Sequence, residues 1–138
     1  MGQILAIDYG RKRTGIAATD DLQMIASGLD TVETKNLLLF LKKYVQENQV
    51  ESFVVGLPTD LKGNLSEIEQ DILQFIAQCR IEFSGIEIHR LDERFTSKMA
   101  SFFISQSGKS KKNREDKALI DKVSATILLQ NFLEQQKK

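Results

Sequence analysis

Four acidic residues occupy positions where a carboxylate is costly to bury, although they are far apart in the sequence. Asp8 ends the apolar run 4–7, which is short and typical of a strand buried on both faces. Asp92 and Glu93 follow another strand-like segment, and Asp121 starts the apolar stripe of a helical segment. A carboxylate at such a place needs a compensating metal ion, cation or set of hydrogen bonds.

A cluster of carboxylates alone suits Mg²⁺ or Mn²⁺, and two such ions roughly 3.5–4 Å apart can activate water against a phosphodiester. Simpler interpretations remain open, since Asp8 beside glycine is equally typical of a turn cap and Asp121 of a first-turn acid favoured by the helix dipole. The small residues Ser124 and Ala125 on the same stripe would let the helix approach the sheet closely, which favours a core-facing Asp121. The sequence does not decide between Asp92 and Glu93 as metal ligand.

Two groups of cations could hold a polyanion by its phosphates. The first is a turn of three basic residues between Gly10 and Gly15, and the second is the charged run 109–117. We expect the run to be solvated and mobile without ligand, and ordered or protected with it. The predicted nucleic-acid contacts are Arg11, Lys12, Arg13, Arg94, Lys109, Lys111, Lys112 and Arg114.

The composition bounds the class of protein. A chain of 138 residues predicts one domain, residues 1–138, and 19 basic against 19 acidic residues leave only the local charge distribution to indicate a partner. The single cysteine, Cys79, fits a reducing compartment, and no segment is typical of a signal peptide or a membrane span. We therefore expect a cytoplasmic protein.

The periodicity predicts the elements that position these residues. Strands are expected at residues 4–7, from 16, at 25–33, 50–56 and 86–91, and helices at about 35–48, 66–79, 97–107 and 118–135. This order predicts an α/β fold with a mixed five-stranded sheet, three strands antiparallel and two parallel, and helices on both faces. The carboxyl ends of the first, fourth and fifth strands would share one edge.

Four motifs in order resemble the YqgF/RuvX family over residues 4 to about 133. They are residues 7–17, Val55-Gly56-Leu57-Pro58 with Gly63, residues 92–97, and Asp121 with Ser124-Ala125. The resemblance implies an RNase H-like fold related to Holliday junction resolvases, in a family described as resolvases or as nucleases that mature the 5′ end of pre-16S rRNA. It also implies that Asp8, Glu93 and Asp121 are the catalytic acids, with Asp92 a rival to Glu93 as metal ligand.

These arguments lead us to expect a metal-dependent nuclease, a monomer or weak homodimer, that acts on an rRNA precursor or branched DNA. One alternative is a non-catalytic nucleic-acid or ribosome-binding module, which would not need converging carboxylates. Another is an ATP-binding protein of the actin and sugar-kinase class, because Asp8-Tyr9-Gly10 is similar to its first phosphate loop. The ATP site of that class lies between two domains, whereas a chain of 138 residues is long enough for one.

Overall fold

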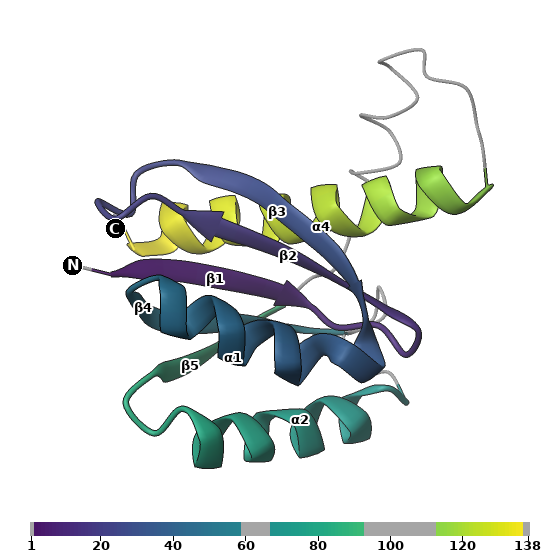
Figure 1. The fold of residues 1–138 in the computed structure, drawn as a ribbon. Coiled ribbons are helices and arrows are strands. Elements are labelled where there is room, and N and C mark those ends of the chain that lie inside the picture. The colour runs from purple at the N-terminus through teal and green to yellow at the C-terminus, as the bar shows by residue number, and fades with distance from the viewer. Residues whose placement is uncertain (1, 59–66, 93–112, 137–138) are drawn as a thin grey trace.

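The computed structural model describes residues 2–58, 67–92 and 113–136, with side chains in the last segment from residue 119 onward. It contains a mixed five-stranded sheet covered by helices (Figure 1). The strands are β1 (Gln3–Asp8), β2 (Arg13–Thr19), β3 (Ala26–Glu33), β4 (Val50–Leu57) and β5 (Glu87–Asp92). The helices are the short η1 (Thr34–Asn36), α1 (Leu37–Glu47), α2 (Glu69–Glu82) and α4 (Asn113–Gln136).

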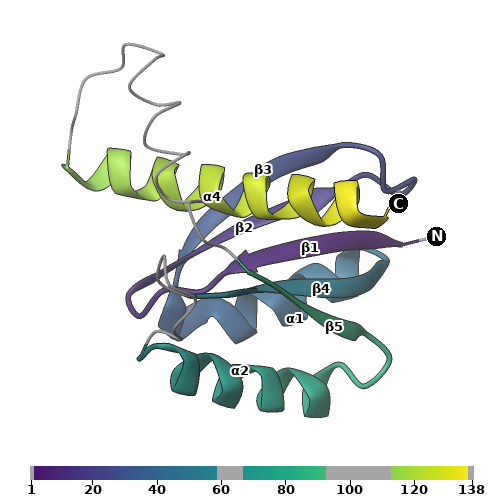
Figure 2. The same cartoon turned by 180° about the vertical axis from the view of Figure 1, so that it is seen from behind.

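The sheet has the strand order β3-β2-β1-β4-β5, which confirms the predicted fold class. β2 pairs antiparallel with both β1 and β3, whereas β4 pairs parallel with both β1 and β5 (Figure 2). β1, β4 and β5 therefore end at one edge of the sheet. Asp8 lies at this edge beside Gly15 of β2, and Asp92 lies there beside Leu57 of β4.

Helices cover both faces, with α1 and α2 on one side and α4 on the other (Figure 1). In β1, Leu5 and Ile7 join the core cluster under α1 and α2, while Ile4 and Ala6 join the cluster under α4. This alternation follows from the two-residue period of a strand. The same alternation shows on which face of the sheet Asp8 and Asp92 lie at the ends of their strands.

Two predicted boundaries are wrong. α4 begins at Asn113 and not near residue 118, so it includes part of the predicted charged loop; Glu115 and Asp116 lie in its first turns, where the helix dipole favours acids. β2 begins at Arg13, so Gly15 lies inside a strand and not at its start. The predicted helix at 97–107 and the possible cap Ser66 lie outside the described residues. Within the described part of the chain, no helix is long and apolar enough to span a membrane.

Candidate active site

Asp8 and Asp121 are each adjacent to Gly15 of β2. Asp8 follows Ile4 and Ala6 at two-residue spacing, so it lies on the face of the sheet that α4 covers. Its partner in the β1–β2 pair is Gly15, and a Cβ atom at Gly15 would overlap the backbone carbonyl of Asp121. The start of the buried part of α4 is thus in direct contact with the strand beside Asp8.

The Asp121 carboxylate is partly buried and carries an ion pair. Arg13 donates a hydrogen bond from Nε to Oδ2 of Asp121 at 2.9 Å, and the Asp121 side chain is only 24% exposed. Burial raises the pKa of Asp121 above its ordinary value, while the hydrogen bond and charge of Arg13 act in the opposite direction. A cation at this carboxylate therefore offsets part of the cost of burying it.

Asp92 lies on the opposite face of the sheet from Asp8. In β5, Leu91 packs with the cluster under α4, whereas Arg90 reaches Glu69 of α2. Asp92 shares the alternation of Arg90 and so belongs to the α2 face. Among the described residues, which do not include Glu93, no three His, Cys, Asp or Glu side chains are grouped closely enough to hold a metal ion.

The turn between β1 and β2 is held by Thr34 at the start of η1. The Thr34 amide donates to the carbonyl of Lys12 at 2.9 Å, and its hydroxyl donates to the carbonyl of Gly10. The hydroxyls of Thr34 and Thr14 are also 2.9 Å apart. A side chain at Gly10 would overlap the carbonyl of Arg13, so this tight turn requires glycine there. Sequence reasoning missed Thr34, because nothing in the sequence connects it with a turn more than twenty residues earlier.

Arg11 and Lys12 project from this turn as exposed cations. Arg11 is 61% exposed and lies 3.6 Å from a carboxylate oxygen of Asp71 and 4.0 Å from one of Glu67. Ion pairs of such geometry and exposure contribute little free energy, so a phosphate could compete for Arg11. Of the three predicted cations in the turn, Arg13 pairs with Asp121, an acid of the candidate site.

Arg90 forms a second polar cluster at the same edge, which sequence reasoning also missed. Its guanidinium binds both carboxylate oxygens of Glu69 at 2.9 and 2.7 Å, and the carbonyls of Val55 and Gly56 at 3.1 and 3.0 Å. Glu69 is 7% exposed. The cluster therefore joins the end of β4 to β5 and to the start of α2. A signal was present, since Arg90 follows Ile86 and Ile88 at two-residue spacing, and a partly buried guanidinium on such a face requires a partner.

The carboxylate oxygens on the α4 face are suitable ligands for a divalent cation. Asp8 and Asp121 supply carboxylate oxygens, the ligands that Mg²⁺ and Mn²⁺ prefer, and Asp121 already attracts the positive charge of Arg13. One helical turn further, the buried hydroxyl of Ser124 has no hydrogen-bond partner within the described part of the chain. An ordered water could satisfy such a hydroxyl.

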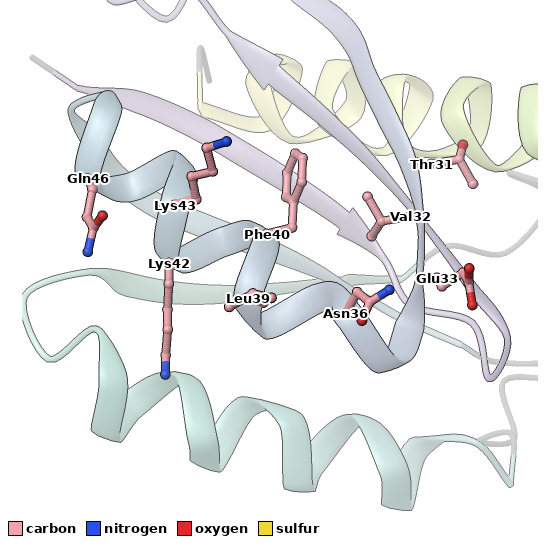
Figure 3. Close-up of a pocket in the computed structure, with 9 residues that line it drawn as sticks. All are labelled: Thr31, Val32, Glu33, Asn36, Leu39, Phe40, Lys42, Lys43 and Gln46. Atoms are coloured by element: carbon pink, nitrogen blue, oxygen red, sulfur yellow. The ribbon is translucent and has the colours of Figure 1, made fainter.

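A groove of about 820 Å³ lies elsewhere, between β3 and α1 (Figure 3). It is on the face of the sheet opposite α4, and its single acid is Glu33. Size alone would make it a default ligand site, but it contains none of the converging carboxylates. Its lining residues are Thr31, Val32, Glu33, Asn36, Leu39, Phe40, Lys42, Lys43 and Gln46.

Several predicted site residues lie outside the described residues or have no described side chain. Glu93 and Arg94 belong to the segment that follows β5, and Arg114 lies in α4 with its side chain undescribed. Their roles stay predictions, as do those of Lys109, Lys111 and Lys112, which also lie outside the described residues.

Comparison with known proteins independently supports a nuclease. A family described as "RuvX: Holliday junction resolvase" matches residues 2–135. A protein of Phocaeicola vulgatus named "Putative pre-16S rRNA nuclease" is 48% identical over 137 residues, which cover 99% of each chain. A protein of Flavobacterium psychrophilum with the same name is 47% identical over 133 residues, covering 96% of this chain and 97% of that protein.

The fold is similar to that of a solved nuclease structure. "T. thermophilus RuvC in complex with Holliday junction substrate" aligns with a TM-score of 0.59 at 14% identity, covering 100% of this chain and 98% of that chain. This likeness shows an RNase H-like fold. The family match and the curated relatives establish that the chain belongs to the RuvX family of nucleases.

Proposed function

We propose that this protein hydrolyses phosphodiester bonds in structured nucleic acid, with Mg²⁺ or Mn²⁺ held by Asp8, Asp121 and Glu93. The observation that carries this proposal is the contact of the Asp121 backbone with Gly15, the residue that pairs with Asp8. A partly buried acid next to a second acid is costly for a protein that only binds nucleic acid. A metal-dependent hydrolase would use both acids to bind its metal ion.

We assign the third carboxylate to Glu93 and not to Asp92. Asp92 shares the face of Arg90 and α2, whereas Asp8 and Asp121 are on the face of α4. A metal ion bound by Asp8 and Asp121 therefore calls for an acid other than Asp92. The family motif around residues 92–97 supports Glu93 in this role.

The chain's own groups have separate tasks in this proposal. Divalent cations bound at the site would help to activate water and stabilise the leaving oxygen of the phosphodiester. Asp8 and Asp121 would supply carboxylate oxygens from a strand and a helix that meet at Gly15. Arg11 and Lys12 lie on the turn next to this point, exposed, and can bind flanking phosphates.

The substrate we favour is the 5′ region of a pre-16S rRNA, processed in the cytoplasm. The support is that curated relatives at 47–48% identity over nearly the full chain carry the name of a pre-16S rRNA nuclease. The second candidate is a four-way DNA junction. It is supported by the description of the family and by the fold shared with a RuvC structure that contains a junction.

A cleavage assay tests both substrates. A pre-16S rRNA fragment and a four-way DNA junction would each be incubated with wild-type protein in Mg²⁺, in Mn²⁺ and in EDTA. We expect metal-dependent cleavage of the rRNA fragment, and its loss in Asp8→Asn and in Glu93→Gln. Asp92→Asn is the matched control and should retain most of the activity. Cleavage that persists in EDTA, or that Asp92→Asn abolishes and Glu93→Gln does not, would contradict the assignment.

A further inference from the structure

Arg13 contacts Asp121, an acid of the candidate site. Its Nε is 2.9 Å from Oδ2 of Asp121, across a sequence separation of 108 residues. Both side chains are only partly exposed, at 38% for Arg13 and 24% for Asp121. The pair is therefore shielded from solvent more than the Arg11 pairs, in which Arg11 itself is 61% exposed.

The backbone fixes the geometry of this contact. Arg13 is two residues from Gly15 on β2 and so faces α4 as Gly15 does. Gly15 contacts the Asp121 backbone directly, and Gly10 and Thr34 hold the other end of the turn. Arg13 thus reaches Asp121 from a strand that is paired on both sides, and the guanidinium occupies the side of the carboxylate that carries Oδ2.

We propose that Arg13 is a positioning residue that holds Asp121 when no divalent cation is bound and gives up the carboxylate when a cation binds. This inference rests on the proposed function, since it requires a divalent cation at Asp121. The guanidinium and the metal ion are both positive, and both need the Asp121 oxygens. Close approach of two cations is unfavourable in a partly buried site, so a divalent cation that binds both oxygens of Asp121 would displace the guanidinium from Oδ2.

The exchange has a measurable consequence for cation affinity. Arg13→Gln removes the competitor and keeps a side chain of similar polarity, so Mn²⁺ should bind about fivefold more tightly, within the range that a partly exposed ion pair contributes. Titration calorimetry on the full chain measures the dissociation constant. Arg11→Gln is the matched control, because it removes one charge from the same turn but has no contact with Asp121, and it should leave the affinity nearly unchanged.

A second measurement follows the hydrogen bond itself in the wild-type protein. The NMR signal of the Arg13 Nε–H should move when Mg²⁺ saturates the site, whereas the Arg11 Nε–H signal should stay. This readout needs no variant, so it remains decisive if Arg13→Gln does not fold. If Arg13 were purely structural, its Nε–H signal would stay when Mg²⁺ is added. Arg13→Gln would then change the melting temperature but not the affinity for Mn²⁺.

The outcomes separate this inference from the proposed function. If the wild type binds Mn²⁺ and Asp121→Asn weakens that binding, while Arg13→Gln leaves it equal or weaker, Arg13 exchange is overturned and the metal site stands. If neither the wild type nor Arg13→Gln binds Mn²⁺, both proposals fail. Tighter binding in Arg13→Gln together with a Mg²⁺-dependent shift of the Arg13 signal supports the exchange.

Discussion

The candidate site depends at the residue scale on how the protein accommodates Asp121. The backbone of Asp121 packs on Gly15, which leaves its carboxylate partly buried, and Arg13 compensates part of the lost hydration. Burial still dominates, because the pKa of Asp121 is raised in spite of the arginine. The folded protein therefore bears a cost for the ionised acid, as active sites often do.

Asp121→Asn should reveal this cost as a pH-dependent difference in stability. A raised pKa means that the contribution of Asp121 is fully present below the ordinary value of 3.8 and is lost as the pH rises through the folded-state pKa. At pH 7 the asparagine variant should thus be as stable as wild type or up to about 1 kcal/mol more stable. At pH 3 the two should be equal. Urea unfolding at both pH values measures the difference, and a variant less stable at pH 7 would mean that the attraction to Arg13 outweighs burial.

Gly15→Ala tests the contact that joins the two acids. The new methyl group would meet the Asp121 backbone, which cannot turn aside, so α4 must shift. We expect a loss of about 2–3 kcal/mol, typical of overpacking, together with weaker Mn²⁺ binding. Gly28→Ala is the matched control on β3, because there the methyl group meets the flexible side chain of Lys122. It should cost less than 1 kcal/mol in thermal unfolding, and equal costs for the two variants would show that close approach at Gly15 is not special.

Polar clusters hold the sheet edge together at the scale of elements. Thr34 links η1 to the β1–β2 turn, and Arg90 links β5 to the end of β4 and to Glu69 of α2. These contacts cross long sequence distances, so they fix the relative position of strands that supply acids from separate parts of the chain. Two of those acids, Asp8 and Asp92, lie at the ends of the strands concerned.

Breaking the Arg90 cluster should destabilise the fold more than removing its acid. Arg90→Ala leaves the buried carboxylate of Glu69 without a guanidinium, and we expect a loss of about 3 kcal/mol in chemical denaturation. Glu69→Gln keeps an oxygen to accept from Arg90 and should cost about half as much. The double variant should lose less stability than the sum of the losses in the two single variants, which would show that Arg90 and Glu69 are energetically coupled. Additive effects would mean that the pair is not energetically linked.

The periodicity of the sequence was sufficient to predict the helices and strands, because alternation and helical spacing are local properties. It therefore predicted the sheet type and the helices on both faces, whereas the shared site of Asp8 and Asp121 stays a prediction. Charged residues at a helix start carry no such periodicity, which is why the start of α4 was predicted too late. The roles of Gly15, Thr34 and Arg90 depend on tertiary contacts, and only the structure shows them.

The charge distribution is the property that matters at the scale of the whole molecule. Basic and acidic residues balance at 19 each, so overall charge does not attract nucleic acid. Affinity must come from local groups of cations near the acids. The described group is the β1–β2 turn, and the sequence places a second group in the run 109–117 just before and within the start of α4.

Replacement of Lys111, Lys112 and Arg114 by alanine should weaken nucleic-acid binding and flatten its dependence on salt. Each phosphate contact releases counterions, so losing three contacts should reduce the slope of log K against log salt by about two to three. Fold stability should change little, because surface substitutions usually cost less than about 0.5 kcal/mol. Binding of a pre-16S rRNA fragment to a cleavage-deficient Asp8→Asn background, measured at several salt concentrations, gives the slope.

A second triple variant separates a local contact from a general loss of charge. Lys35, Lys42 and Lys43 are equally basic, but they lie in η1 and α1, and two of them line the groove on the face of the sheet away from Asp121 (Figure 3). Their replacement by alanine changes the net charge by the same amount, so any effect of net charge alone would be equal in the two variants. If the run 109–117 binds phosphates, only the first variant lowers the slope. Equal slopes in both variants would remove the run from the binding surface and leave the β1–β2 turn as the main phosphate contact.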